Sequence, residues 1–242
     1  VGKNVVHYTF ELSETAVGLR YDSNLCGIPS SDVIDRKEEV IEFYKNNQLG
    51  RLIIKEYPTG TPSVQTLRNH IEKLLLKSFV PSVIIIDYAD IMRSSRQFDS
   101  LRHELKLVYE ELRGLSMELQ VPIWTASQSN KEGANADIID MTNMSEAYGK
   151  AMICDVIVSI SRRPHEKANG WGRLYVAKNR AGRDGIVFPI KMNTARSKFE
   201  IVGESDVPTF SPNQEENAQK QALRAKWKEL KSEFSAAGRD DV

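Results

Sequence analysis

Four polar side chains stand where predicted strands of this chain end, and together they could carry out phosphate chemistry. They are Glu11, Asp87, Gln128 and Lys178. In open α/β sheets, ligands bind beyond the carboxyl ends of the strands. If these ends converge, one site holds a pair of carboxylates, an amide and a cation, which is the set that hydrolysis of a nucleoside triphosphate needs. One carboxylate would hold Mg²⁺ through water and the other would activate the attacking water, while the amide would sense the γ-phosphate and the cation would stabilise transition-state charge.

The residues just before Asp87 give the most specific of these signals. Residues 83–86 form a continuous aliphatic run, and four aliphatic residues followed by Asp make the Walker B pattern of nucleotide-binding proteins. The same pattern also ends ordinary strands, in which the acid caps the next turn. Glu11 and Gln128 are weaker signals, because a polar residue after a strand is more often solvated or part of a cap. The patterns alone therefore leave both interpretations of each residue open.

The elements that must position these residues follow from hydrophobic periodicity and from helix and turn signals. We expect strands at 4–10, 51–56, 83–86, 121–126, 155–160, 173–177, 186–192 and 198–202, and helices at 13–25, 35–47, 63–77, 100–120, 145–152 and 214–236. The charged stretch 162–172 is expected to be a turn. Alternation of strands and helices followed by a meander predicts an α/β fold with a doubly wound, mostly parallel sheet and antiparallel edge strands. Trp124 lies inside one of these strands, and we expect it in the core.

Composition limits the classes of protein to which the chain can belong. It has 242 residues, 33 Lys and Arg against 33 Asp and Glu, and 40% hydrophobic residues, which is typical of a globular domain. No apolar run reaches the roughly 18 residues of a membrane span. Cys26 and Cys154 stand alone and fit a reducing cytoplasm, and the histidines lie too far apart in sequence to suggest a metal cluster. Because the net charge is zero, any nucleic-acid footprint must be local.

Several segments in order resemble the motifs of one family. They are VVHYTFELSE (5–14), the stretch 51–71, VIIIDYADIM (83–92), VPIWTASQSN (121–130), MSEAYGKAMICDVIVSI (144–160) and LYVAKNRAGRDG (174–185). Together they resemble the hexameric DnaB-type replicative helicases, above all the T-even-like phage branch. The resemblance covers the chain from its start to about residue 202, and it rests on the order and spacing of the motifs because none of them decides the matter alone.

The resemblance implies a RecA-like motor domain in residues 1–202, with a linker at 203–213 and an amphipathic helix and tail at 214–242. It implies ATP or another NTP and Mg²⁺ as cofactors, with Glu11 as catalytic base, Asp87 holding Mg²⁺ through water, and Gln128 as sensor. Lys178 and Arg180 match a basic pair that points at the neighbouring subunit's nucleotide in a ring, with Arg180 as an arginine finger. The candidates for contact with DNA are Lys131, Glu146, Gly149, Arg93 and Arg96.

The partners that the resemblance implies are single-stranded DNA, further copies of the chain in a hexameric ring, and a primase and a helicase loader. No membrane partner is expected, and the place of action would be the cytoplasm, that of the host if the chain is phage-encoded. A translocating enzyme must be indifferent to base sequence, so it should hold phosphates rather than base edges.

One expected motif is missing from the sequence. A Walker A loop needs Gly-x-x-x-x-Gly-Lys-Ser/Thr followed by a helix, but Gly2 and Lys3 are followed by Asn4 and a strand. In the family this loop and its helix come just before that strand. We therefore expect that residues 1–202 lack the first strand and the P-loop, that the chain is truncated at its N-terminus, and that alone it hydrolyses ATP poorly.

Two other functions stay open on the sequence. A RecA-like recombinase shares the order of motifs, although the pair Lys178 and Arg180 favours the helicase branch. A non-catalytic RecA-fold module for binding or assembly would explain the missing P-loop. Retention of Glu11, Asp87, Gln128 and Arg180 argues against that module, because a protein without catalysis has no physical need for all of them.

Overall fold

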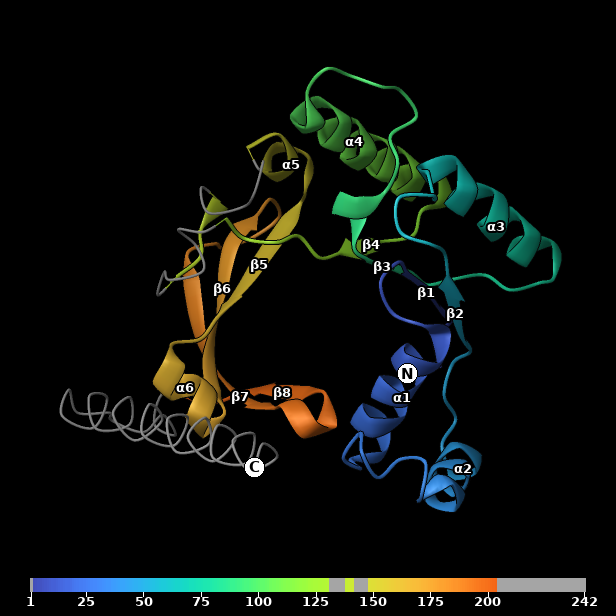
Figure 1. Ribbon diagram of the computed structural model, residues 1–242, viewed down its shortest axis with the longest axis vertical. Coiled ribbons are helices and arrows are strands. Elements are labelled where there is room, and N and C mark those ends of the chain that lie inside the picture. Colours follow the sequence, from blue (N-terminus) through green and yellow to red (C-terminus); the bar gives the residue numbers. More distant parts are fainter. Residues whose placement is uncertain (1, 131–137, 142–147, 204–242) are drawn as a thin grey trace, which may run out of the picture.

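The chain folds into a parallel sheet and an antiparallel sheet that stand beside each other, in a computed structural model that describes residues 2–130, 138–141 and 148–203 (Figure 1). The strand orders are β2-β1-β3-β4 in the parallel sheet and β5-β6-β7-β8 in the antiparallel sheet. The expected α/β class with parallel and antiparallel strands is confirmed. The difference from the expectation is that, within the described residues, the strands form two sheets in place of one continuous sheet.

The parallel half contains the first four helices. Its strands are β1 (Val5–Thr9), β2 (Leu52–Glu56), β3 (Val83–Asp87) and β4 (Ile123–Thr125), and its helices are α1 (Glu14–Cys26), α2 (Lys37–Asn46), α3 (Val64–Leu76) and α4 (Leu101–Leu119). Ser13 caps α1 by accepting the backbone N–H of Ala16, and Ser63 forms a capping box with Thr66 at the start of α3. These caps place the helix starts where the sequence predicts them.

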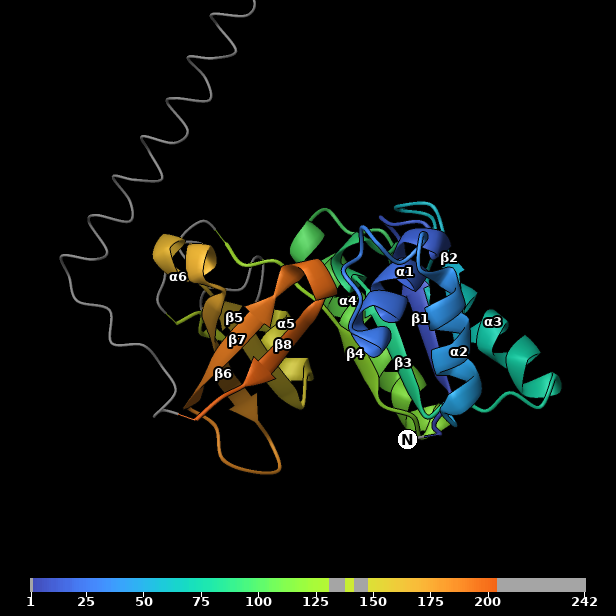
Figure 2. The same ribbon diagram turned by 90° about the horizontal axis from the view of Figure 1, so that it is seen from below.

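The main core lies between the parallel sheet and helices α3 and α4. It combines the alternate strand residues Val6, Tyr8, Ile84 and Ile86 with Leu67, Ile71, Val108, Leu112 and Leu115 of the helices. The opposite face of the sheet receives α1, whose Gly18 lies beside Ile54 of β2. Figure 1 shows the sheet between α1 and α2 on one side and α3 and α4 on the other, and in the view of Figure 2 α1 and α2 lie in front of the sheet. Helices on both faces explain the continuous aliphatic run of β3, because such a strand is buried on two sides.

The antiparallel half consists of β5 (Val156–Ser161), β6 (Trp171–Asn179), β7 (Ile186–Asn193) and β8 (Lys198–Ile201). Helix α5 (Tyr148–Ile153) precedes it, and helix α6 (Pro164–Asn169) joins β5 to β6. The short 3₁₀ turns are η1 (Ala89–Ile91) and η4 (Thr194–Arg196). We had expected a charged turn where α6 lies, although Pro164 in the first helical turn and Gly170 in a left-handed C-cap are the usual signals of a short helix.

The predicted linker at 203–213 and the helix at 214–236 lie, but for residue 203, outside the described residues. The same holds for the first residues of the helix expected at 145–152. Within the described part of the chain, none of the helices combines the length and the apolar character that crossing a membrane requires.

Candidate functional site

The register between β1 and β3 brings two of the predicted site residues together. Thr9 is paired with Asp87 at the carboxyl ends of these strands, and the backbone N–H of Phe10 donates to the Asp87 carbonyl over 3.1 Å. The Thr9 hydroxyl then donates to the Leu12 carbonyl over 2.9 Å and closes a tight turn. Glu11 lies in this turn, just beyond the end of β1, which is paired with the end of β3 that carries Asp87.

A tyrosine joins Glu11 to Gln128. The hydroxyl of Tyr88 donates to Oε1 of Glu11 over 3.2 Å and accepts from Nε2 of Gln128 over 3.0 Å. Partial burial and the contact with the Glu11 carboxylate both raise the pKa of Tyr88, so its hydroxyl stays protonated at neutral pH. Three of the four predicted strand ends therefore meet, as the sequence predicts. Tyr88 was missed, although its place directly after Asp87 could have drawn attention to it.

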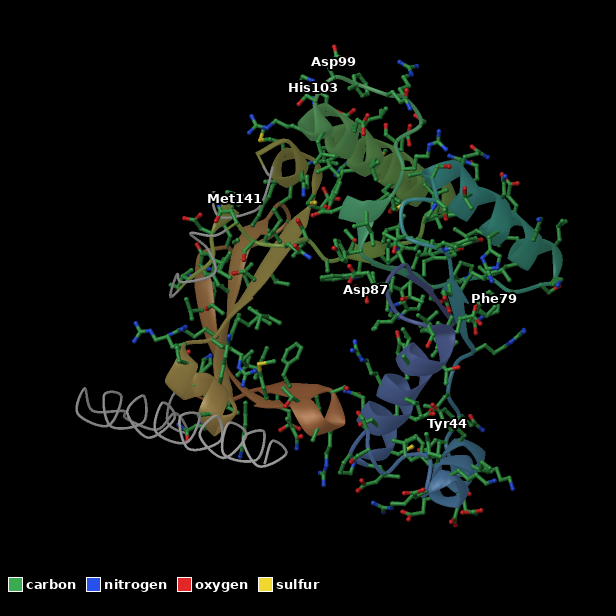
Figure 3. The ribbon with its side chains drawn as sticks, viewed as in Figure 1. Tyr44, Phe79, Asp87, Asp99, His103 and Met141 are labelled. Carbon is green, nitrogen blue, oxygen red and sulfur yellow. The ribbon has the colours of Figure 1, made fainter. Side chains whose placement is uncertain are left out.

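Asp87 lies on the side of the parallel sheet that faces the antiparallel sheet (Figure 3). Within the described part of the chain, its carboxylate has no hydrogen-bond or ion-pair partner. A carboxylate without a competing cation is a suitable oxygen ligand for Mg²⁺, which usually keeps several water ligands. Among the residues that the structure describes, no group of three or more His, Cys, Asp or Glu side chains could hold a metal directly. The site thus fits contact with a hydrated ion rather than an all-protein cage.

His7 lies on the neighbouring strand, on the face of the sheet that receives α1. Its Nδ1 is 3.0 Å from the hydroxyl of Tyr21, and its Nε2 is buried without a hydrogen-bond partner. Burial lowers the pKa of His7, and the Asp87 carboxylate opposes this shift. The ring is therefore neutral at neutral pH and adds no positive charge beside Asp87.

Lys178 does not join the other three residues. Its Nζ donates to the carbonyl of Ala151 over 2.7 Å, and Nη2 of Arg180 donates to the carbonyl of Met152 over 3.1 Å. The reason is topological: β6 runs antiparallel to β5, so Asn179 at its carboxyl end is paired with Val156 at the start of β5. Convergence of all four strand ends, which the parallel-sheet rule suggested, fails at this strand.

The candidate residues for DNA contact are distributed over different parts of the chain. Gly149 lies in α5, where an added Cβ would be 3.4 Å from Cγ of Lys106 in α4. Arg93 and Arg96 are exposed in the loop before α4, and Asp99 of that loop lies far from Asp87 in Figure 3. The other two candidates, Lys131 and Glu146, lie outside the described residues.

The geometry can now be compared with known proteins. The family model of the DnaB-like helicase C-terminal domain matches residues 2–200. The chain belongs to this family. A DnaB-like replicative helicase of Enterobacteria phage T4 is 30% identical over 171 residues, which are 66% of this chain and 36% of that protein. A replicative helicase DnaB of Haemophilus influenzae is 23% identical over 224 residues, or 84% of this chain and 46% of that protein. The chain thus spans less than half the length of these relatives.

Solved structures agree on the fold. An ATPase domain covers 83% of this chain with a TM-score of 0.72 at 14% identity, and the match covers 75% of that domain. A DnaB-like replicative helicase, described together with its interactions with primase, covers 83% of this chain with a TM-score of 0.69 at 15% identity, and the match covers 52% of that chain. The RecA-like α/β class that the sequence predicts is thereby confirmed.

This DnaB-like domain has a hollow of about 720 Å³ between its two sheets. Strand β4 is one wall and β5 is the other, and residues of α4 also line it. Both strands are edge strands, because each pairs on one side only within the described residues. Trp124 of β4 points into this hollow with 51% of its surface exposed, so the expectation that it is a core residue is wrong. The sequence pattern identified the strand but could not tell an edge strand from a central one.

A buried polar cluster links the loops of this family domain, and sequence reasoning missed it. The carboxylate of Asp90 accepts hydrogen bonds from Tyr109 over 2.7 Å and from Ser127 over 2.8 Å, and it forms a 2.8 Å ion pair with Lys150. Lys150 has only 1% of its surface exposed. The only sequence feature that could have indicated burial of Lys150 is the apolar run Ala151, Met152 and Ile153 directly after it.

Proposed function

We propose that this chain is the motor part of a replicative DNA helicase that couples NTP hydrolysis to movement along single-stranded DNA and to unwinding of the duplex. The observation that carries the proposal is the joining of Glu11 and Gln128 through Tyr88 beside Asp87, in a chain of the DnaB-like family. The missing P-loop is the one observation in favour of the non-catalytic module, and the arrangement of Glu11, Tyr88 and Gln128 beside Asp87 weighs against it.

In this proposal the strand ends of the parallel half form the catalytic side of a nucleotide site. Asp87 would hold Mg²⁺ through water, and the bound ion would neutralise charge on the phosphates of ATP or another NTP. Glu11 would orient and deprotonate the attacking water. Gln128 would contact the γ-phosphate, and the bridge through Tyr88 supports this, because it fixes the amide at the same edge as both carboxylates.

Lys178 and Arg180 would serve the nucleotide of a neighbouring copy in a ring of six. The antiparallel turn of β6 supports this assignment, because it takes both cations away from their own Asp87 and leaves Arg180 half exposed on the second sheet. A guanidinium supplied in this way stabilises the charge that develops on the transferred phosphoryl group.

Single-stranded DNA would be held mainly by its phosphates, since a translocating enzyme cannot depend on base identity. Lys131, Glu146 and Gly149 would line the channel, with Arg93 and Arg96 as additional cations. One related helicase has described interactions with a primase, and we propose a primase and a loader as partners here too. The place of action would be the cytoplasm, where the replicating DNA lies.

The domain limits are part of the proposal. Residues 1–202 would be a RecA-like core that needs one more strand and a P-loop, followed by a linker at 203–213 and a C-terminal helix and tail at 214–242. The hollow between β4 and β5 supports the missing strand, because it lies between two unpaired strand edges and is lined by Trp124, Val156, Val158 and Ile160. A strand placed there would pair on both sides and cover this apolar surface.

The test joins the strand, P-loop and helix of a family member ahead of Gly2 and measures NTP turnover with and without single-stranded DNA, together with unwinding. Asp87→Asn should lower turnover by about a hundredfold or more, and Arg180→Ala by about a thousandfold. Asp99→Asn, in a loop far from Asp87, is the matched control and should keep full turnover. The 242-residue chain alone should show almost none.

Mixing the two inactive variants tests the ring. If Arg180 serves a neighbouring subunit, Asp87→Asn and Arg180→Ala protomers should together recover part of the turnover, because some interfaces then hold an intact Asp87 and an intact Arg180. An Arg180→Ala variant with full turnover would contradict the finger role. DNA-dependent turnover with filament formation and no unwinding would favour the recombinase.

A further inference from the structure

Helix α5 is fixed to the rest of the molecule at both of its ends. Near its start, Nζ of Lys150 bonds the Asp90 carboxylate over 2.8 Å and the Ser127 hydroxyl over 3.3 Å. At its end, cations from other parts of the chain bond its terminal carbonyl groups. A helix this short has little stability of its own, so these contacts determine where it lies.

The contact at the start of α5 is a largely buried ion pair with further hydrogen bonds on both partners. The ammonium of Lys150 also lies 5.6 Å from the ring centre of Tyr109, whose hydroxyl bonds the second oxygen of Asp90 over 2.7 Å. Ser127 completes the set of donors to this carboxylate. Apolar residues of similar size often stabilise a core as well as a buried ion pair does. Apolar residues cannot supply a directed bond from α5 to the loops that hold Asp90 and Ser127.

The contacts at the end of α5 come from α4, from β6 and from Arg180, the residue directly after β6. Lys178 bonds the carbonyl of Ala151 and Arg180 that of Met152, while Nη1 of Arg113 bonds the carbonyl of Ile153 over 2.5 Å. The last carbonyl groups of a helix have no partners within the helix and carry partial negative charge, so cations are favourable there. Asp155, just beyond the helix, pairs with both Arg113 and Arg180.

These contacts connect the elements that the proposed function treats separately. Asp90 lies three residues after Asp87, and Ser127 directly precedes Gln128. The helix itself follows the segment that holds Lys131 and Glu146. Its far end bonds the pair Lys178 and Arg180, assigned above to the neighbouring subunit's nucleotide.

We infer that Lys150 and Asp90 are a positioning pair that makes α5 a rigid link between the subunit's own nucleotide loops and its finger pair at the end of β6. The inference rests on the proposed function and adds the route by which occupancy of one nucleotide site reaches the next. A shift of the loops at Asp87 and Gln128 moves Asp90 and Ser127, and these carry Lys150 and α5 with them. The displacement of the Ala151 and Met152 carbonyls then repositions Lys178 and Arg180.

Amide hydrogen exchange on the 242-residue chain tests the link without any need for activity. Two reporter amides are Cys154, which bonds the Lys150 carbonyl, and Arg180, which bonds the Asp155 carbonyl over 2.9 Å. In Lys150→Met both should exchange about tenfold faster, which corresponds to about 1.4 kcal/mol in opening free energy. The matched control is Arg68→Met, which removes an ion pair between α3 and α4 and should leave both amides unchanged.

A double variant separates a link from a merely stabilising pair. Lys150→Met leaves Asp90 without its cation and could impair folding, whereas Asp90→Asn combined with Lys150→Met leaves no buried charge and should regain the urea midpoint of the parent chain. In this folded variant the Arg180 amide should still exchange about tenfold faster than in the parent chain, because the bond from Lys150 of α5 to Asp90 is then absent. The inference is overturned if the Arg180 amide of the double variant exchanges at the parent rate when stability is regained. It is also overturned if neither variant changes the exchange rate of this amide.

Activity of the complete polypeptide gives the second measurement. In the double variant, stimulation of NTP turnover by single-stranded DNA should fall about tenfold, with KM for the nucleotide changed by less than about twofold. Stimulation equal to that of Arg68→Met would overturn the inference. If the parent polypeptide itself shows no DNA-stimulated turnover, the proposed function fails, and the exchange measurement alone decides whether the link exists.

Discussion

Within the described residues, the parallel and the antiparallel sheet have the same number of strands, but the two halves are stabilised differently. The parallel sheet packs against helices on both faces and supplies the strand residues of the main core. The antiparallel sheet buries few apolar side chains, and those it leaves exposed are Val156, Val158, Ile160, Val187, Phe199 and Ile201. Burial of apolar area therefore stabilises the half that carries Asp87, while strand pairing and polar contacts stabilise the half that carries Arg180.

This difference fits a division of labour. In the proposed function, the strand ends at Glu11, Asp87 and Gln128 need fixed geometry, which a close-packed core provides. In the same proposal, the antiparallel half would contact a further strand and a neighbouring subunit, and exposed apolar side chains are suited to such contacts.

The largest effect on stability should come from truncating an isoleucine to alanine, compared between the two halves. Ile84 of β3 is fully buried, whereas Ile160 of β5 keeps 42% of its surface exposed. Ile84→Ala should lower the free energy of unfolding by about 2–5 kcal/mol, and Ile160→Ala by less than about 1 kcal/mol. Urea titration of the 242-residue chain measures both. Equal losses would contradict the comparison.

A polar contact should matter more than an apolar one in the antiparallel half. Oε2 of Glu166 accepts from Nη2 of Arg173 over 2.9 Å and from the backbone N–H of Arg163 over 2.6 Å, and both side chains of the ion pair are largely buried. Glu166→Ala should cost about 1–3 kcal/mol in unfolding free energy by urea titration. Glu200→Ala, which removes the exposed pair with Lys198, is the control and should have no measurable effect.

Filling the hollow between β4 and β5 should reduce the difference in apolar burial between the two halves. With a strand and P-loop segment joined ahead of Gly2, Trp124 should lose its contact with water, and acrylamide should quench its fluorescence less than in the chain alone. The difference between the parent and Trp124→Phe isolates its emission from that of Trp171 and Trp227. Unchanged quenching would mean that the added strand does not enter between β4 and β5.

The smallest effect concerns a surface contact of the parallel half. The backbone N–H of Glu56 donates to Glu14 and holds the pKa of that carboxyl below its usual range, with Lys55 adding to the shift. A lowered pKa in the folded state stabilises the fold above the unfolded pKa, and this contribution is lost as the pH falls through the folded value. Glu14→Gln should therefore lower the urea midpoint slightly at pH 7 but hardly at about pH 3. Glu42→Gln on α2 is the control, and an equal effect at both pH values would contradict the assignment.

Much of the parallel half could be predicted from local signals. Ser63 and the spacing of Val64, Leu67, Ile71 and Leu74 define α3, because capping and periodicity are properties of neighbouring residues. The placement of Glu11, Asp87 and Gln128 at one edge could be predicted for a similar reason, since parallel strands end at one edge of a sheet.

The rest depends on contacts between distant parts of the chain. The burial of Lys150 requires Asp90, sixty residues away, and no local pattern reports such a partner. The exposure of Trp124 follows from the place of β4 at a sheet edge, which strand periodicity does not encode. Helix α6 is different, because Pro164, Glu166 and Gly170 marked it and the surrounding charges led us to expect a turn.

The bridge through Tyr88 also has a polarity. A phenol has one proton, and Tyr88 gives it to Glu11 while receiving a hydrogen bond from the Gln128 amide. The order of donors and acceptors is thus fixed from Gln128 to Glu11. A nucleotide that draws the Gln128 amide away would therefore leave an oxygen lone pair of Tyr88 without its donor. The bridge therefore has a single orientation for as long as the amide nitrogen of Gln128 faces Tyr88.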